Sequence, residues 1–240
     1  QVSGDERNIR VDVWSDVVCP FCYLGKTRLE RVAREQGVTL QWVWHSFELD
    51  PDAPAARAGS SSEHLANKYG MTLAEAERQQ ERIATLFAQE GLVFNWRTAR
   101  GGNTRNAHRI IQAAQDKGLG NEAEEAFFRA YFTDGRPVGE ADTVRAVATE
   151  IGLSAAEIDT ALTSAEINDR VEEDIRTAHR HGVRGVPFFV FENQVAVSGA
   201  QPVELFAEAL QTAWSEQTPT VLGGADAEAC GPDGCEVPQQ

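Results

Sequence analysis

The alternation of apolar and polar residues predicts a strand, a helix and a second strand at the start of the chain. Residues 9–14 alternate as a half-buried strand does, and residues 38–44 alternate again with many β-branched and aromatic side chains. Between them, apolar side chains recur at helical spacing from Leu24 to Ala33, and Gly37 follows where a helix C-cap is expected. Together these elements form a β-α-β unit.

The pattern then becomes helical and remains so to about residue 181. Residues 52–62 contain proline, glycine and serine and read as a linker. Thr72 and Ser154 each have a glutamate three residues later, which is the capping-box pattern of a helix start. Glycines at the positions expected for helix C-caps are Gly70, Gly91, Gly118, Gly152 and Gly182.

A β-hairpin and a helix follow the helical block. Residues 187–191 and 194–198 have strand character and are joined by a short turn. Pro202 opens a last helix that runs to about Ser215. A β-α-β unit and a β-β-α unit separated by helices describe an α/β protein, with a thioredoxin fold interrupted by a large α-helical insertion domain.

This order divides the chain into four parts. The last part is predicted to be a flexible tail, because it is rich in Gly, Pro, Asp and Glu and poor in apolar residues. The parts are residues 1–57 (thioredoxin fold, first part), 58–181 (helical insertion), 182–216 (thioredoxin fold, second part) and 217–240 (tail with Cys-x4-Cys).

Two cysteines, Cys19 and Cys22, stand at the junction of the first strand and the first helix. Unpaired backbone N–H groups and the helix dipole stabilise a thiolate at such a place. Thiols of Cys-x-x-Cys motifs at helix starts titrate at about 3.5 to 7, against about 8.5 for a free cysteine, and the thiolate is the form that attacks disulfides. Pro20 suits the first helical turn. The pair is therefore predicted to be catalytic.

A structural zinc site is the alternative use of these cysteines. Cys230 and Cys235 could complete a set of four thiolates with Cys19 and Cys22. Zinc knuckles usually sit in short hairpins, whereas a long amphipathic helix follows the first pair. We therefore expect dithiol chemistry, with no metal and no other cofactor.

Composition narrows the choice of partners. The chain has 240 residues with 22 Lys and Arg against 37 Asp and Glu, so its net charge is −15. Nucleic acid and anionic membranes are poor partners for such a chain, since phosphate binding relies on Lys and Arg. No apolar run approaches the roughly 18 residues of a membrane span, and residues 1–10 lack the apolar core of a signal peptide. Four cysteines are few for a secreted scaffold, so we expect a cytoplasmic protein.

Five motifs follow one another along the chain. They are SDVVCPFCYLG at 15–25, FELDP at 47–51, NTRNAHR at 103–109, GVRGVPFFV at 182–190 and SGAQP at 198–202. In this order they resemble the DsbA family of thioredoxin-fold thiol-disulfide oxidoreductases, and most closely its FrnE-like branch. The resemblance covers about residues 9–215.

The resemblance implies roles for Val186 and Pro187. In this family the peptide bond before this proline is cis and faces the dithiol, and the preceding residue offers its backbone to the substrate chain. The alternative is an edge-strand proline at the start of a strand. Related branches that carry serine in place of the cysteine pair act as glutathione-dependent isomerases. Both cysteines are present here, which favours dithiol chemistry.

Pro20 and Phe21, between the two cysteines, are expected to tune the redox potential. Phe21 replaces the histidine of the strongly oxidising family members, so one polar stabiliser of the thiolate is missing. We expect a pair less oxidising than DsbA at about −120 mV and closer to thioredoxin at about −270 mV. Asp12, on the strand that leads to the site, is a candidate for the buried acid that shuttles the proton of the second cysteine in thioredoxins, with a half-exposed strand carboxylate as the alternative.

The tail cysteines are predicted to form a second redox pair. FrnE-like proteins resemble this chain in a C-terminal Cys-x4-Cys motif, and the turn between Cys230 and Cys235 is tight enough to bring them together. Acidic neighbours disfavour their thiolates, which suits them to receive or pass on a disulfide from the first pair. These neighbours are Asp226, Glu228, Asp233 and Glu236. A tail disulfide or free thiols without a role remain the alternative.

We therefore predict a protein thiol-disulfide oxidoreductase or isomerase. Its partners are protein or peptide substrates with disulfides or thiols, and a cellular thiol reductant or oxidant. Two alternatives remain open. One is a peptide-binding or chaperone-like module with a structural cysteine set, with or without bound zinc, and the other is a glutathione-dependent isomerase of the same superfamily.

Overall fold

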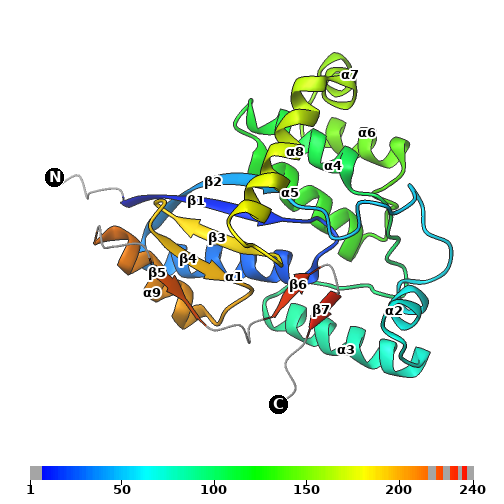
Figure 1. Ribbon diagram of the computed structural model, residues 1–240, viewed down its shortest axis with the longest axis horizontal. Helices are drawn as coiled ribbons and strands as arrows, with labels where there is room; N and C mark the ends of the chain where they lie inside the picture. The colour runs from blue at the N-terminus through cyan, green and yellow to red at the C-terminus, as the bar shows by residue number, and fades with distance from the viewer. Residues whose placement is uncertain (1–6, 216–219, 224–227, 232–233, 237–240) are drawn as a thin grey trace.

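The computed structural model describes residues 7–215, 220–223, 228–231 and 234–236. Its central element is a five-stranded sheet with the strand order β2-β1-β3-β4-β5 (Figure 1). The elements of this part are β1 (Arg7–Ser15), α1 (Pro20–Gln36), β2 (Val38–Ser46), β3 (Phe188–Phe191), β4 (Val195–Ser198), α9 (Val203–Trp214) and β5 (Thr220–Leu222).

The sheet combines the two units that the sequence predicts. β1 and β2 are parallel and are connected through α1, while β3 runs antiparallel to both β1 and β4. The predicted α/β class with a thioredoxin fold and a helical insertion is confirmed. The first helix begins at Pro20 and ends before Gly37, whose φ of 65° is the left-handed conformation expected of a glycine C-cap.

The insertion between β2 and β3 is helical. Its elements are α2 (Ser61–Tyr69), α3 (Leu73–Gln89), α4 (Arg105–Gln115), α5 (Gly120–Phe128), the π-helical turn η1 (Arg129–Thr133), α6 (Ala141–Glu150), α7 (Ala155–Thr163) and α8 (Ala165–Arg180). In Figure 1, α4 to α8 form a group beside β2, whereas α2 and α3 lie apart from it, near the tail strands.

Capping explains where several of these helices begin. The boxes predicted at Thr72 and Ser154 both form, each with reciprocal hydrogen bonds to the glutamate three residues on. Ser60 and Glu63 form a further capping box at the start of α2. Ser60 lies within residues 52–62, whose composition predicted a linker, so α2 begins inside that predicted linker.

The tail contains strands where the composition predicted a flexible segment. β5 pairs in parallel with β4, and β6 (Ala229–Gly231) forms an antiparallel hairpin with β7 (Gly234–Glu236). Backbone hydrogen bonds hold these strands, and such bonds do not depend on apolar side chains. Low apolar content therefore did not predict them.

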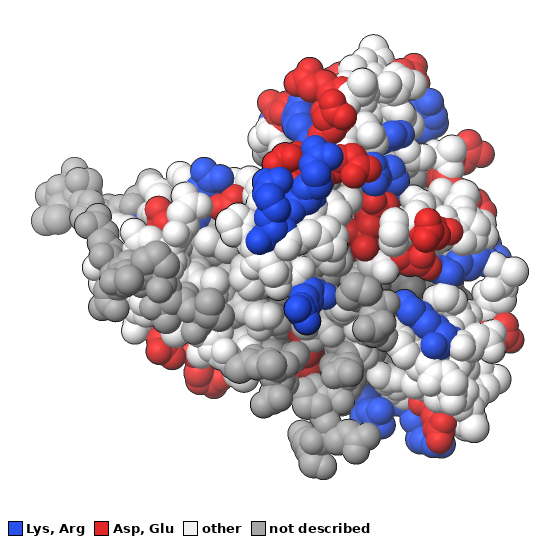
Figure 2. Space-filling view, in the orientation of Figure 1, with Lys and Arg blue, Asp and Glu red and all other residues white. Residues whose placement is uncertain are grey.

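Charges of both signs are mixed on the surface of α8. Figure 2 shows acidic and basic side chains side by side over this helix. Glu173, for example, lies within ion-pair distance of Arg176 and Arg180, at 3.1 and 2.8 Å. Within the described part of the chain, no helix is long and apolar enough to cross a lipid bilayer.

An ionic cluster joins the sheet to α8. The two ring nitrogens of His45 lie 2.7 Å from the carboxylates of Asp12 and Asp174, and its ring stacks on Trp14. Burial alone would lower the pKa of His45, but the hydrogen bonds to the two carboxylates outweigh burial and raise the pKa to about 9. His45 is thus a cation held between two strands and a helix.

This cluster predicts how stability depends on pH. Because the pKa of His45 rises from 6.5 to about 9 on folding, its contribution is complete below pH 6.5 and is lost as the pH rises through 9. The difference in free energy of unfolding between wild type and His45→Gln should shrink over this range by on the order of 3 kcal/mol. Urea unfolding at several pH values measures it.

The exposed His181, just beyond α8, supplies the control. His181→Gln should keep the pH dependence of the wild type. Equal pH dependence in His45→Gln and wild type would contradict the role of the cluster.

Candidate active site

Cys19 and Cys22 lie at the start of α1, as the sequence predicts. The turn after β1 is closed by a 3.1 Å hydrogen bond from the Cys19 amide to the carbonyl of Asp16. Cys19 is then the N-cap of α1, and Pro20 occupies the first turn. Both cysteines are free thiols, and their side chains are buried.

The two thiols have different surroundings. Burial raises the pKa of Cys22 above its usual range, and the neighbouring Cys19 raises it further. The amide of Asp16 and the side chain of Ser15 oppose this effect without cancelling it. Cys19 faces the other way, toward the loop before β3, and its sulfur lies 3.6 Å from the carbonyl oxygen of Val186. Cys22 is therefore the inner thiol of the pair.

The loop before β3 packs directly on α1. The Val186–Pro187 peptide bond is cis, as the family resemblance implies. Gly25 permits the close approach, because a Cβ atom there would stand 3.1 Å from the ring of Phe189 and 3.3 Å from that of Pro187. A glycine inside a helix costs stability, so the close packing explains why position 25 is a glycine.

The tail lies on this loop as an added strand. The amide of Val186 donates to the carbonyl of Cys230, and the amide of Cys230 donates to the carbonyl of Val186, both at 2.7 Å. Gly185 makes room for this pairing, since a Cβ atom there would lie 2.9 Å from the Cys230 carbonyl oxygen. The backbone of Val186, predicted to hold substrate, is thus occupied by the chain's own tail.

A second contact fixes the same strand at its other end. The amide of Ala200 donates to the carbonyl of Glu228 at 2.8 Å, and the carboxylate of Glu228 lies 3.4 Å from the guanidinium of Arg28. The predicted acidic surroundings of the tail thiols are thus partly neutralised at Glu228. Asp226 and Asp233 lie outside the described residues.

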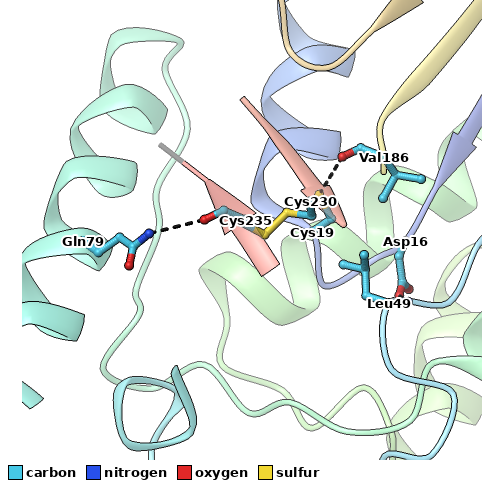
Figure 3. The surroundings of a disulfide bond; sticks show 7 residues. All are labelled: Asp16, Cys19, Leu49, Gln79, Val186, Cys230 and Cys235. Carbon is cyan, nitrogen blue, oxygen red and sulfur yellow. Dashed lines mark hydrogen bonds between the residues drawn. A yellow bond between two sulfur atoms is a disulfide. The ribbon is translucent and has the colours of Figure 1, made fainter. Parts of the chain in front are cut away.

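The tail cysteines form a disulfide beside Cys19. Cys230 and Cys235 are bonded to each other, and the sulfurs of Cys19, Cys230 and Cys235 all lie within 4.8 Å of one another (Figure 3). The side-chain amide of Gln79 donates to the carbonyl of Cys235 at 3.3 Å and ties the hairpin to α3. The structure therefore brings the two predicted redox pairs together, with Cys19 facing the tail disulfide.

A cavity of about 170 Å³ borders this disulfide. It lies between the hairpin and the helices α2 and α3, and most of its lining is apolar. Lining side chains include Leu49, Leu65, Tyr69, Ile83, Phe94 and Phe132. Such a cavity next to the thiols can accept apolar side chains of a peptide.

Buried polar residues from the insertion lie on the inner side of the dithiol. Glu124 of α5 is 1% exposed and accepts a 2.8 Å hydrogen bond from the Ser15 hydroxyl. His108 of α4 bonds to the carboxylate of Asp16 at 3.0 Å. Neither His108 nor Glu124 was predicted from the sequence as a residue of the site. The position of Glu124 in the sequence could have indicated that it is buried. It precedes Phe127 by three residues and so lies on an apolar face of its helix.

Asp12 lies elsewhere. It is on the face of β1 that points to α8, where its carboxylate bonds to Arg10 and His45. Burial would raise the pKa of Asp12, but these hydrogen bonds outweigh burial and lower it. Successive strand residues point to opposite faces, so Asp12 cannot reach the dithiol as Ser15 does. The proton-shuttle role considered for Asp12 is therefore wrong.

Comparison with known proteins agrees with this geometry. A family model described as a DSBA-like thioredoxin domain matches residues 10–211. The crystal structure of the probable DsbA oxidoreductase SCO1869 from Streptomyces coelicolor is similar, with 39% identity, a TM-score of 0.81, and coverage of 96% of this chain and 100% of that chain.

Two more distant proteins are also similar. The uncharacterized protein YwbO of Bacillus subtilis (strain 168) is 24% identical over 204 residues, which cover 84% of this chain and 96% of that protein. The cytosolic disulfide reductase DsbM from Pseudomonas aeruginosa, in its structure with GSH, has 18% identity and a TM-score of 0.59, covering 86% of this chain and 99% of that chain.

The close approach at Gly185 predicts a way to loosen the hairpin. In Gly185→Ala the new methyl group would press on the Cys230 carbonyl, and overpacking of this kind costs roughly 1 to 3 kcal/mol. Alkylation of Cys19 by iodoacetamide should then become about fivefold faster or more, as measured by peptide mass spectrometry. Gly152→Ala is the control for destabilisation elsewhere in the fold, because its φ of 103° strains an alanine there although no atom lies within 4 Å of the new methyl group, and it should leave the Cys19 rate unchanged. An unchanged Cys19 rate in Gly185→Ala would contradict the shielding of Cys19 by the hairpin.

Proposed function

The chain belongs to the DSBA-like thioredoxin domain family, and we propose that it exchanges disulfides with protein or peptide substrates through Cys19 and Cys22. The observation that carries this proposal is a disulfide that lies against Cys19, on a strand paired with Val186. Cys19 is the sulfur that lies beside this disulfide, and Cys22 is the second free thiol of the pair.

The cycle consists of two thiol-disulfide exchanges. The thiolate of Cys19 attacks one sulfur of a substrate disulfide, and the other substrate sulfur leaves as a thiolate and takes up a proton. Cys22 then loses its proton and attacks Cys19, which releases the second substrate sulfur. The enzyme is oxidised to a Cys19–Cys22 disulfide and the substrate is reduced to a dithiol. The reverse sequence oxidises a substrate.

The tail supports a relay between the two cysteine pairs. Cys230 pairs its backbone with Val186, so it occupies the place where the family resemblance puts the substrate chain. Attack of Cys19 on Cys230 breaks the Cys230–Cys235 bond, and Cys235 leaves as a thiolate. Cys22 then attacks Cys19 and releases Cys230. One disulfide passes from the tail to the first pair, and the reverse steps return it.

The tail also competes with other substrates in this proposal. A peptide that pairs with Val186 needs the same amide and carbonyl that Cys230 occupies. Substrate exchange and tail exchange therefore alternate at a single site. A second cysteine pair used in this way supports the assignment of the chain to the FrnE-like branch. The small number of cysteines supports a cytoplasmic location.

Insulin disulfide reduction with dithiothreitol as electron source tests the central proposal. Cys19→Ser should fall to the uncatalysed rate, because the attacking sulfur is gone. Cys230→Ser should retain part of the activity, since its first pair is intact. If Cys19→Ser reduces insulin as fast as the wild type, the dithiol is not the catalyst. That result would favour a binding module or one held together by zinc.

A trapping experiment tests the relay and its direction of attack. In Cys22→Ser the resolving sulfur is absent, so attack of Cys19 on the tail should leave a Cys19–Cys230 disulfide and a free Cys235. Acid quenching, alkylation and peptide mapping identify the linkage. The double variant Cys22→Ser/Cys230→Ser is the control and cannot form it. Recovery of Cys230–Cys235 alone from Cys22→Ser would overturn the relay.

A further inference from the structure

The thiol of Cys22 is shielded from solvent. Cys22 is 1% exposed, and burial raises its pKa. In the proposed cycle Cys22 must nevertheless lose a proton each time it attacks Cys19, and regain one each time the disulfide is reduced. A group that accepts and returns this proton has to lie within hydrogen-bond reach of Cys22, directly or through one intermediate.

A chain of neighbouring polar groups leads from Cys22 to a carboxyl group. Ser15 ends β1 on the face toward α1, and its side chain lies close enough to Cys22 to influence the pKa of that thiol. The same hydroxyl lies 2.8 Å from Oε1 of Glu124, which α5 brings in from the insertion. The three groups are buried, so Cys22, Ser15 and Glu124 form a continuous path shielded from solvent.

The surroundings of Glu124 leave it able to exist in both protonation states. Burial raises its pKa, and nearby Asp16 adds to that effect. His108 from α4, the hydrogen bond from Ser15, and Lys26 from α1 act in the opposite direction. The result is a pKa of about 7. A group that titrates near neutral pH is suited to accept and to donate a proton in one cycle.

We propose that Glu124 is the proton acceptor and donor for Cys22, with the Ser15 hydroxyl as the intermediate. When Cys22 attacks, its proton passes to the Ser15 oxygen while the Ser15 proton passes to Glu124. The Cys22 sulfur forms its bond to Cys19, and the released substrate or tail sulfur leaves as a thiolate. In the reverse reaction Glu124 returns the proton to Cys22. This inference rests on the proposed function of the two cysteines.

The position of Glu124 explains how the site obtains an acid although the one acid of β1, Asp12, lies on the face away from the dithiol. On β1 the side chains that alternate with Asp12 toward α1 are Val13 and Ser15, and neither is a carboxylic acid. The insertion supplies the acid from the other side of the dithiol. The insertion thus contributes to proton transfer as well as to the walls of the site.

A two-phase reaction with Ellman's reagent tests the proposal. The full chain carries Cys230→Ser and Cys235→Ser so that the tail does not compete. Cys19 attack releases one thionitrobenzoate and leaves a mixed disulfide, and Cys22 attack then releases a second. In the parent protein the rate of the second release should rise with pH through about 7, as Glu124 loses its proton.

In Glu124→Gln the first release should be unchanged. The second should become roughly 100-fold slower and should lose its dependence on pH near 7, because Cys22 must ionise without a base. Ser15→Ala keeps the carboxyl group but breaks the path, so it should slow the second release in the same way. Glu125→Gln is the matched control, since this neighbour bonds to Tyr23 and Lys26 and not to the dithiol path, and it should leave both releases unchanged.

The outcomes separate this inference from the proposed function. A second release that keeps the parent rate and pH profile in both Glu124→Gln and Ser15→Ala would overturn the role of Glu124 alone. If Glu124→Gln does not fold, Ser15→Ala decides the question by the same profile. Absence of the first release from the parent protein would instead overturn the attack by Cys19, and with it the inference.

Discussion

The carboxylate of Asp16 ties together three segments that the site requires. It accepts hydrogen bonds at 2.9 Å from the amides of Val17 and Leu49, and it lies 3.0 Å from the ring of His108. These contacts join the turn between β1 and α1 to the segment after β2 and to helix α4. The pKa of His108 is raised, mainly because its hydrogen bond to Asp16 outweighs the effect of burial. The position of Cys19 at the helix start depends on this buried pair.

Local sequence patterns predicted the parts of the molecule that local interactions determine. The first strand, the helix from Pro20 and two capping boxes are encoded by residues near one another, and so is the Cys-x-x-Cys junction. Family resemblance added the cis bond at Pro187. The sequence did not reveal Glu124 as part of the site, because its contact with Ser15 spans 109 residues and depends on how α5 packs.

The tail shows a second limit of prediction from the sequence. Its low apolar content predicted flexibility, yet β6 is held by reciprocal backbone hydrogen bonds with Val186, which the composition does not reveal.

The error at Asp12 has a geometric cause. A shift of one residue along β1 exchanges the two faces of the sheet, and this decides between the cluster at His45 and the dithiol.

Because the tail is covalently joined to the rest of the chain, a substrate needs a minimum affinity to displace it from Val186. A segment joined to its own binding site has an effective concentration of millimolar order, whatever the concentration of the protein. A peptide in solution that pairs with Val186 therefore competes against a partner that dilution does not remove. Substrates with low affinity would be excluded at micromolar concentration, whereas an extended chain that also fills the apolar cavity beside Cys235 could compete. If substrates bind as proposed, the tail would select them by affinity before any sulfur reacts.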